Sequence, residues 1–218
     1  MKNIYILLIS CLLCFNNSYS QYHYLPYIGT GKNPGGLNTN FETTTLSGWV
    51  SILNGALTSG TYSAAQTIPF PFVFSGDTVK KYKVSNSGIL TFDIATAISP
   101  GTTNTSLPSA SVPDSAICVW GISGTGANDK IFTKTFGASP NRQHWIFFNS
   151  YTGGSFSCYW SIVLEESTNN IHIVDQRSTG SVSGLTLGVQ TNSTTATQVA
   201  GSPNVSRLSV DNYKQYDN

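Results

Sequence analysis

Residues 68–92 read IPFPFVFSGDTVKKYKVSNSGILTF, and their pattern decides the fold. Aromatic residues occupy every second position in the first part of this stretch, at Phe70, Phe72 and Phe74. Side chains two residues apart project from the same side of an extended backbone, so the three rings share one face of a strand. Pro69 and Pro71 have no N–H to donate to a neighbouring strand, which favours the edge of a sheet. The pattern therefore predicts an edge strand with one aromatic face.

The remainder of this stretch predicts two chain reversals. Ser75-Gly76-Asp77 interrupts the first strand, and alternating apolar residues resume at Tyr82 and Val84. Asn86-Ser87-Gly88 then supplies the small residues that a tight turn into Ile89–Phe92 requires. We therefore expect successive strands joined by tight turns.

Further segments also have the character of strands. They are residues 116–122, 130–136, 143–150, 156–166, 171–175 and 185–189. The first is almost continuously apolar, as expected of a strand covered on both faces, and the others alternate. No segment of ten or more residues after residue 20 shows helical spacing. We predict an all-β fold, an antiparallel and jelly-roll-like β-sandwich of about nine or ten strands in two packed sheets.

The composition indicates one domain and argues against nucleic-acid binding. A chain of 218 residues can form one β domain with a substantial core. Only 10% of the residues are charged, and 11 Lys and Arg balance 10 Asp and Glu. Because there is no net field and no basic cluster stands out, we expect no nucleic-acid partner.

The first 20 residues have the form of a secretory signal peptide. Lys2 precedes an apolar run at 4–15, and a short polar stretch leads to Gln21. A second interpretation is the lipobox-like Leu8-Ile9-Ser10-Cys11, whose cysteine would carry a lipid anchor. The apolar run is too short to span a bilayer and no later segment approaches the necessary length, so we expect no transmembrane segment.

The chain is expected to have three parts. The signal peptide at 1–20 precedes an extended lead-in at 21–48, where prolines and glycines oppose regular structure. The β-sandwich domain then covers 49–218, and its first strand begins near Trp49.

Two cysteines remain after the signal peptide, Cys118 and Cys158, each within an apolar strand-like run. In an exported protein they could form a disulfide. Alternatively, both are buried small apolar residues, because free cysteine is among the most buried residue types. The sequence leaves both alternatives open.

Candidate reactive residues show no catalytic or metal-binding pattern. His23, His144 and His172 are far apart and have no partner at metal-ligand spacing, so we interpret His144 and His172 as structural. Glu165 and Glu166 are neighbours on a strand and point to opposite faces, so they cannot form the facing pair of a glycosidase. We interpret them as solvated surface residues, and we expect no catalytic residues and no metal site.

Calcium is the one cofactor that the sequence leaves as an alternative. Four aspartates lie in or near loops with oxygen-bearing neighbours: Asp77, Asp93, Asp114 and Asp129. Such oxygens suit calcium, but the chain has no D-x-D-x-D-G loop. We therefore expect no cofactor.

Two tyrosines are the candidate ligand-binding residues. Tyr151 lies beside Gly153-Gly154, and Tyr159 is on the polar side of its strand. Exposed rings of this kind could stack against sugars or against side chains of a partner. Alternatively, they close a loop or cover the edge of a sheet.

Several segments resemble a known family. The 68–92 block resembles the "PF.F.G…v.vs.nG.l.F" signature of β-sandwich domains in secreted Bacteroidetes proteins, and more distantly nidogen-type domains. LPYIGTGKNPGGLNTNFE, SGWVSIL, WIFFNSYTGGSFSCYWSIVLEESTNNIHIVD and SGLTLGVQ resemble other parts of these domains. The resemblance implies export by the type IX secretion system and an adhesive role at the cell surface. Such proteins usually carry a C-terminal sorting domain, which does not follow VSRLSVDNYKQYDN here, so we also consider a truncated product or a periplasmic location.

The expected function is that of an exported, non-enzymatic module for adhesion or interaction, with a protein or glycan partner at the cell surface. One alternative is a carbohydrate-binding accessory of a polysaccharide-degrading system. A second alternative is a hydrolase with an unrecognised site.

Overall fold

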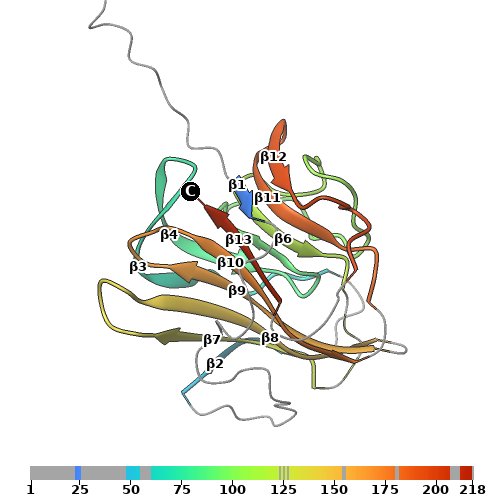
Figure 1. Cartoon of the computed structure of the whole chain (residues 1–218), viewed down its shortest axis with the longest axis horizontal. Helices are drawn as coiled ribbons and strands as arrows, with labels where there is room; N and C mark the ends of the chain where they lie inside the picture. Colours follow the sequence, from blue (N-terminus) through green and yellow to red (C-terminus); the bar gives the residue numbers. More distant parts are fainter. Residues whose placement is uncertain are drawn as a thin grey trace, which may run out of the picture.

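The structure, a computed structural model, describes residues 23–25, 48–54, 60–122, 124, 126, 128–153, 156–179, 182–206 and 212–217. The expected signal peptide and most of the expected lead-in lie outside these residues. The described parts of the chain contain strands, turns and loops but no helix. The strands form two antiparallel sheets that pack against each other, as Figure 1 shows, which confirms the predicted antiparallel β-sandwich.

The larger sheet has seven strands. In spatial order they are β1 (His23–Leu25), β13 (Asn212–Asp217), β10 (Ile171–Thr179), β9 (Phe156–Glu165), β8 (Gln143–Gly153), β7 (Lys130–Phe136) and β2 (Val50–Asn54). β1 and β2 are therefore the two edges of this sheet. Each neighbouring pair is antiparallel.

The smaller sheet has six strands. In spatial order they are β12 (Thr195–Gln198), β11 (Thr186–Asn192), β6 (Ala116–Trp120), β5 (Ile89–Thr91), β4 (Asp77–Val84) and β3 (Gln66–Phe74). The predicted edge position of the proline-containing strand is confirmed, because β3 ends this sheet.

Consecutive strands mostly stay in one sheet. β3, β4, β5 and β6 form one antiparallel meander, and β7, β8, β9 and β10 form the other. The chain then returns to the six-stranded sheet for β11 and β12 and adds β13 to the seven-stranded sheet. This connectivity differs from that of a jelly roll, in which the chain passes between the two sheets at nearly every connection.

The core between the sheets is built from every second residue of the strands. Phe70, Phe72 and Phe74 project into it and are only 5%, 0% and 1% exposed, which confirms that they share one buried face. From the other sheet, Phe148 and Trp160 stack with ring centroids 4.4 Å apart and planes 11° apart. Burial of each such side chain contributes roughly 1.5–3 kcal/mol.

A long connection covers the outer face of the six-stranded sheet. The residues between β5 and β6 pack Leu107 and Val112 against Cys118 and Trp120 on the side of β6 that faces away from the core. The Gln190 side chain fastens this connection: its Nε2 donates to the Val112 carbonyl at 2.9 Å. All five residues of β6 are buried, which confirms the prediction of a strand covered on both faces.

Candidate functional site

The edge strand β3 is interrupted by a broad bulge. Thr67 pairs with Lys81, but the next β3 residue in register is Phe72, which pairs with Val79. Residues 68–71 of β3 are therefore opposed by Lys80 alone. Two prolines, Pro69 and Pro71, lie within this segment.

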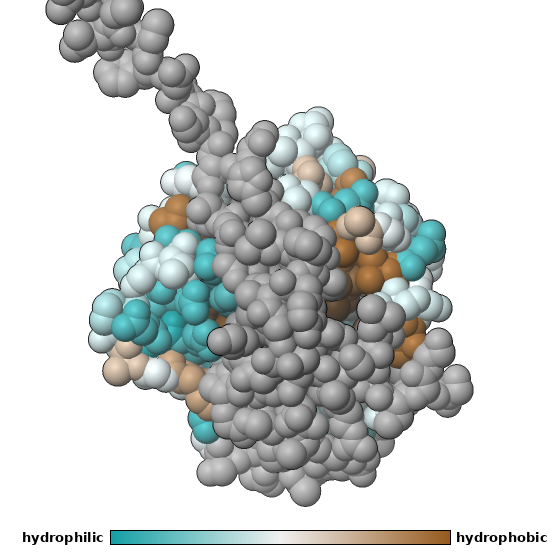
Figure 2. Space-filling model, in the orientation of Figure 1, coloured by the Kyte–Doolittle hydropathy of each residue, from teal (hydrophilic) through white to brown (hydrophobic). Residues whose placement is uncertain are grey.

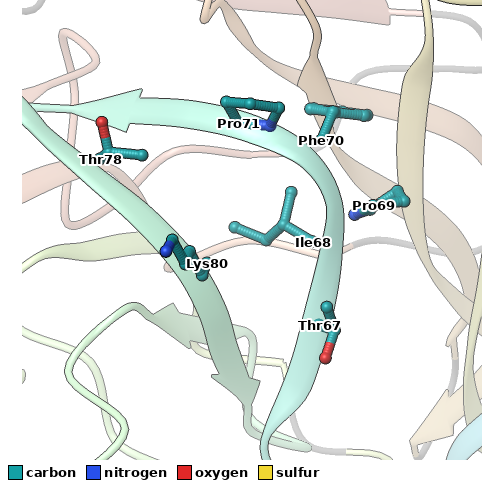
Figure 3. A pocket seen from close by; sticks show the side chains of 7 residues that line it. All are labelled: Thr67, Ile68, Pro69, Phe70, Pro71, Thr78 and Lys80. Atoms are coloured by element: carbon teal, nitrogen blue, oxygen red, sulfur yellow. The ribbon is translucent and has the colours of Figure 1, made fainter.

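The bulge leaves an opening between β3 and β4, which we call the edge opening. Its volume is about 300 Å³, and it is lined by Thr67, Ile68, Pro69, Phe70, Pro71, Thr78 and Lys80. Figure 3 shows Ile68 lying between the two strands, with Lys80 on the opposite side. The walls are mainly apolar, and polar groups are contributed by one ammonium and two hydroxyl groups. An opening of this size accepts a side chain or a small ligand group.

Three lysines lie on β4, and one of them, Lys80, lines the edge opening. Lys80 and Lys81 are exposed and Lys83 is half-buried, so three of the chain's 11 basic residues fall within four positions of β4. The ion pairs among the described residues involve Arg142 and His172, not these lysines. In Figure 2 hydrophilic surface gathers on the left of the view, where Figure 1 places β3 and β4 together with the turns between β7 and β8 and between β9 and β10. The surface of this edge is thus locally basic in a chain whose net charge is only +1.

This basic edge was not predicted from the sequence. The near-zero net charge and the absence of a long basic run concealed it, and the apolar lining comes from a different strand. The spacing of Lys80, Lys81 and Lys83 beside a predicted edge strand was the available signal.

The ion pair between Arg142 and Glu166 contacts Phe70, which lines the opening. The Arg142 guanidinium lies 5.3 Å from the centre of the Phe70 ring. Its Nε and Nη2 donate to the two carboxylate oxygens of Glu166, each at 2.7 Å. These hydrogen bonds hold the pKa of Glu166 at about 2, below its ordinary value. The arrangement fixes Phe70, a lining residue, against the rest of the sandwich.

A second link joins β3 to the turn between β9 and β10. The Val73 N–H donates to the Asn169 side-chain oxygen at 2.8 Å. Asn169 adopts a φ of 57° within the turn predicted at residues 168–170. The edge opening therefore belongs to a strand that is tied to both sheets, so its shape is set before a ligand arrives.

The interpretation of the two glutamates as solvated is wrong for Glu166, which is 8% exposed and held by Arg142. Glu165 lies 3.4 Å from His172 Nε2 and accepts a hydrogen bond from Gln143 at 3.0 Å. Its pKa is lowered to about 2, and the neighbouring His172 side chain is the largest cause. Both carboxylates therefore have structural partners.

The structure corrects the expectation that the two candidate tyrosines are exposed. Tyr151 is 2% exposed and packs in the core at 4.9 Å from Trp160. Tyr159 is 1% exposed and clusters with Phe132 and Phe147 on the outer face of the seven-stranded sheet. That sheet has apolar residues on both faces, so the polar neighbours of Tyr159 in the sequence did not indicate solvent. The two rings lie on opposite faces and do not form one surface with the edge opening.

No disulfide joins Cys118 and Cys158 in the structure, and both thiols are buried. Cys158 points into the core between the sheets, whereas Cys118 points away from it, into the cluster beneath the covering connection. Burial raises the pKa of the Cys118 thiol. The alternative of two buried small apolar residues agrees with this geometry.

Asp129, one of the candidate calcium ligands, is occupied by the backbone. Its carboxylate accepts the N–H of Gly126 at 3.0 Å and that of Thr152 at 3.2 Å. Burial, the largest influence, raises its pKa. Among the residues that the structure describes, no three His, Cys, Asp or Glu side chains gather to hold a metal ion. None of those residues belongs to a helix that could cross a membrane.

These features define an antiparallel β-sandwich with a locally basic, apolar opening at one sheet edge. Residues 38–216 match the family model described as NIDO related, and the chain belongs to this family. The distant nidogen-like resemblance is thereby confirmed. No curated protein and no solved structure matches the chain.

Proposed function

We propose that this protein is an exported, non-enzymatic module that binds a protein partner through an acidic and apolar segment of that partner. The observation that supports this most is the edge opening, where an apolar lining lies beside Lys80, on a strand that also carries Lys81 and Lys83. An apolar side chain of the partner would fill the opening, and carboxylates beside it would face the lysines.

The chemistry of the edge favours recognition by side chains. Pro69 and Pro71 cannot donate N–H groups, so a partner strand cannot extend the sheet along this part of β3. Exposed lysines accelerate encounter with an acidic partner and discriminate against basic ones. The preformed opening lowers the ordering cost of binding.

A non-enzymatic role is consistent with the contacts that three of the described carboxylates make. Glu165 is engaged by His172, Glu166 by Arg142, and Asp129 by backbone N–H groups. A glycoside hydrolase would need two carboxylates directed at a substrate across a cleft. These three carboxylates are instead directed at structural partners.

The burial of Tyr151 and Tyr159 removes the surface on which a sugar-binding role was predicted. Among the described residues, Val50 is the large apolar side chain with high exposure, at 62%. It offers no aromatic platform for a sugar ring. We therefore propose a protein partner, and the glycan alternative becomes an outcome of the test below.

The proposed setting is the cell surface or the extracellular space of a Bacteroidetes cell, with the periplasm as the alternative. It rests on the signal-like residues 1–20 and on the resemblance to type IX secretion substrates. We expect fractionation of producing cells to place the mature protein outside the cytoplasm, with Gln21 as its first residue. An uncleaved cytosolic form as the dominant species would contradict export.

Partner chemistry can be tested with a random peptide library displayed against mature protein. We expect enrichment of peptides in which an apolar residue is flanked by Asp or Glu. The double variant Lys80→Glu, Lys81→Glu should bind the enriched peptide about tenfold more weakly or worse, because two attractive charges become repulsive. Raising the salt concentration should weaken binding to the unchanged protein.

Lys130→Glu is the matched control, because Lys130 lies on β7 of the other sheet. This variant should bind the peptide as the unchanged protein does. Enrichment of neutral or basic peptides, an equal loss in the control, or selective binding on a glycan array in place of peptides would overturn the proposed partner.

A further inference from the structure

Most of strand β4 has a neighbouring strand on one side only. β4 covers Asp77–Val84, but its pairing with β5 is limited to its last two residues, 83 and 84. Residues 77–82 therefore have β3 on one side and no strand of the described chain on the other. The N–H and C=O groups of a strand alternate between its two sides, so about half of those on these residues point away from β3. We call this side of residues 77–82 the open edge.

The chain turns away from the open edge directly after β5. The Phe92 N–H donates to the Ser115 carbonyl at 2.9 Å, on the side of β5 where β6 begins. The Ile94 N–H then donates back to the Phe92 carbonyl at 3.0 Å, which closes a tight turn. The Phe92 ring packs inward, with its centre 4.8 Å from that of Phe74. β5 therefore does not continue alongside the open edge.

The open edge is exposed and has two different faces. Its exposed residues are Asp77, Thr78, Lys80 and Lys81. Val79 is half-buried and packs against the core, and Tyr82 is buried within it. Neighbouring side chains of a strand point to opposite faces, so the two lysines between these residues point away from the core. A strand beside the open edge would meet ammonium groups on its outer face and apolar surface on its inner face.

The two lysines determine which kind of strand fits the open edge. Pairing with a second copy of this chain would bring Lys80 and Lys81 of both copies close together. Like charges opposite each other in a sheet destabilise the pairing, and opposite charges stabilise it. The open edge therefore disfavours a second copy and favours a strand with Asp or Glu on its outer face. Beside Val79, an apolar residue is favoured.

We infer that the open edge of β4 binds an extended segment of a partner protein as an added strand, and that acidic and apolar residues alternate in this segment. The inference deepens the proposed function and rests on it for the acidic and apolar character of the partner. It adds a second contact, which is made by backbone N–H and C=O groups. The edge opening, on the other side of β4, contacts side chains of the partner.

A short peptide of alternating glutamate and valine, blocked at both ends, tests strand addition with mature protein. In an added strand the N–H groups of the valines point to one side and those of the glutamates to the other. N-methylation of one of these two sets should weaken binding about tenfold or more, and N-methylation of the other set should leave it unchanged. Equal effects of the two sets, or an alternating peptide that does not bind, would overturn the inference.

Lys81 separates the open edge from the edge opening, because it lies on the former and does not line the latter. Lys81→Glu should weaken binding of the alternating peptide about tenfold, since an attractive charge becomes repulsive. Lys130→Glu, on β7 of the other sheet, is the matched control and should bind as the unchanged protein does. Unchanged binding in Lys81→Glu would contradict the placement of the strand.

Nuclear Overhauser contacts distinguish failure of this inference from failure of the proposed function. We expect contacts between backbone protons of the peptide and those of residues 77–82. Contacts confined to Ile68 and Phe70 would place the peptide in the edge opening, which overturns strand addition and leaves the proposed function standing. If the library selection yields no acidic and apolar peptide while the alternating peptide pairs with the open edge, the proposed function fails and strand addition stands.

Discussion

Replacing Gly88 by alanine is expected to destabilise the protein by about 2–5 kcal/mol, the sum of backbone strain and a steric clash. Gly88 has a φ of +92°, in the left-handed region that side chains disfavour. A Cβ atom placed there would lie 1.9 Å from the Val119 carbonyl oxygen on β6. The Val119 N–H also donates to the Gly88 carbonyl at 2.8 Å, so the two backbones are held in contact. Neither the backbone at Gly88 nor the backbone at Val119 can move away from the other without breaking this hydrogen bond.

Gly76 provides the matched control. It also follows a strand in a tight turn and has a φ of +89°, but nothing lies within 4 Å of the position of its Cβ. Gly76→Ala should cost only the strain, about 1 kcal/mol. Urea unfolding of both variants measures the difference, provided that the m-value is unchanged. Equal losses of unfolding free energy in the two variants would show that the contact between Gly88 and β6 is not tight.

Stability is expected to fall by about 3 kcal/mol as the pH is lowered from 6.5 to 4, because of His144. The imidazole joins the two sheets: its Nε2 lies 3.0 Å from the Tyr82 hydroxyl and its Nδ1 lies 3.0 Å from Thr135 Oγ1. Burial lowers the pKa of His144 from 6.5 to about 4. The unfolded chain therefore binds a proton in this pH range that the folded chain does not. The contribution to stability is fully present above pH 6.5 and is lost as the pH falls.

His144→Gln tests the assignment, because glutamine can hydrogen-bond but does not titrate. The variant should be less stable at pH 7 and should lose most of the slope of unfolding free energy between pH 4.5 and 6.5. The low pKa values of Glu165 and Glu166, about 2, place their own contributions below pH 4.5. A variant with the full slope of the unchanged protein would assign the pH dependence to another group.

Much of the sandwich could be predicted because the geometry of each strand is visible in residues that are neighbours in the sequence. Alternation in the 156–166 segment corresponds to β9, and the prolines beside Phe70 mark an edge strand. These features depend on the backbone period and on a missing N–H group, both of which are readable from neighbouring residues.

The candidate site was harder to predict because it depends on contacts between distant segments. Alternation shows that Tyr159 and Cys158 point to opposite faces, but it does not show that both faces are covered. The relation of Cys118 to Cys158 depends on which side of each sheet meets the core. The edge opening arises only when a bulge in β3 meets Lys80 of β4, and its support by Arg142 crosses between the sheets.

Hydrogen–deuterium exchange of the mature protein, with and without its enriched acidic peptide, tests the central claim most directly. We predict slower exchange in β3 and β4, over residues 66–84, where the edge opening lies. The strands β8 to β10 should exchange as they do in the unbound protein. Protection that is confined to any surface other than the β3–β4 edge would contradict the account.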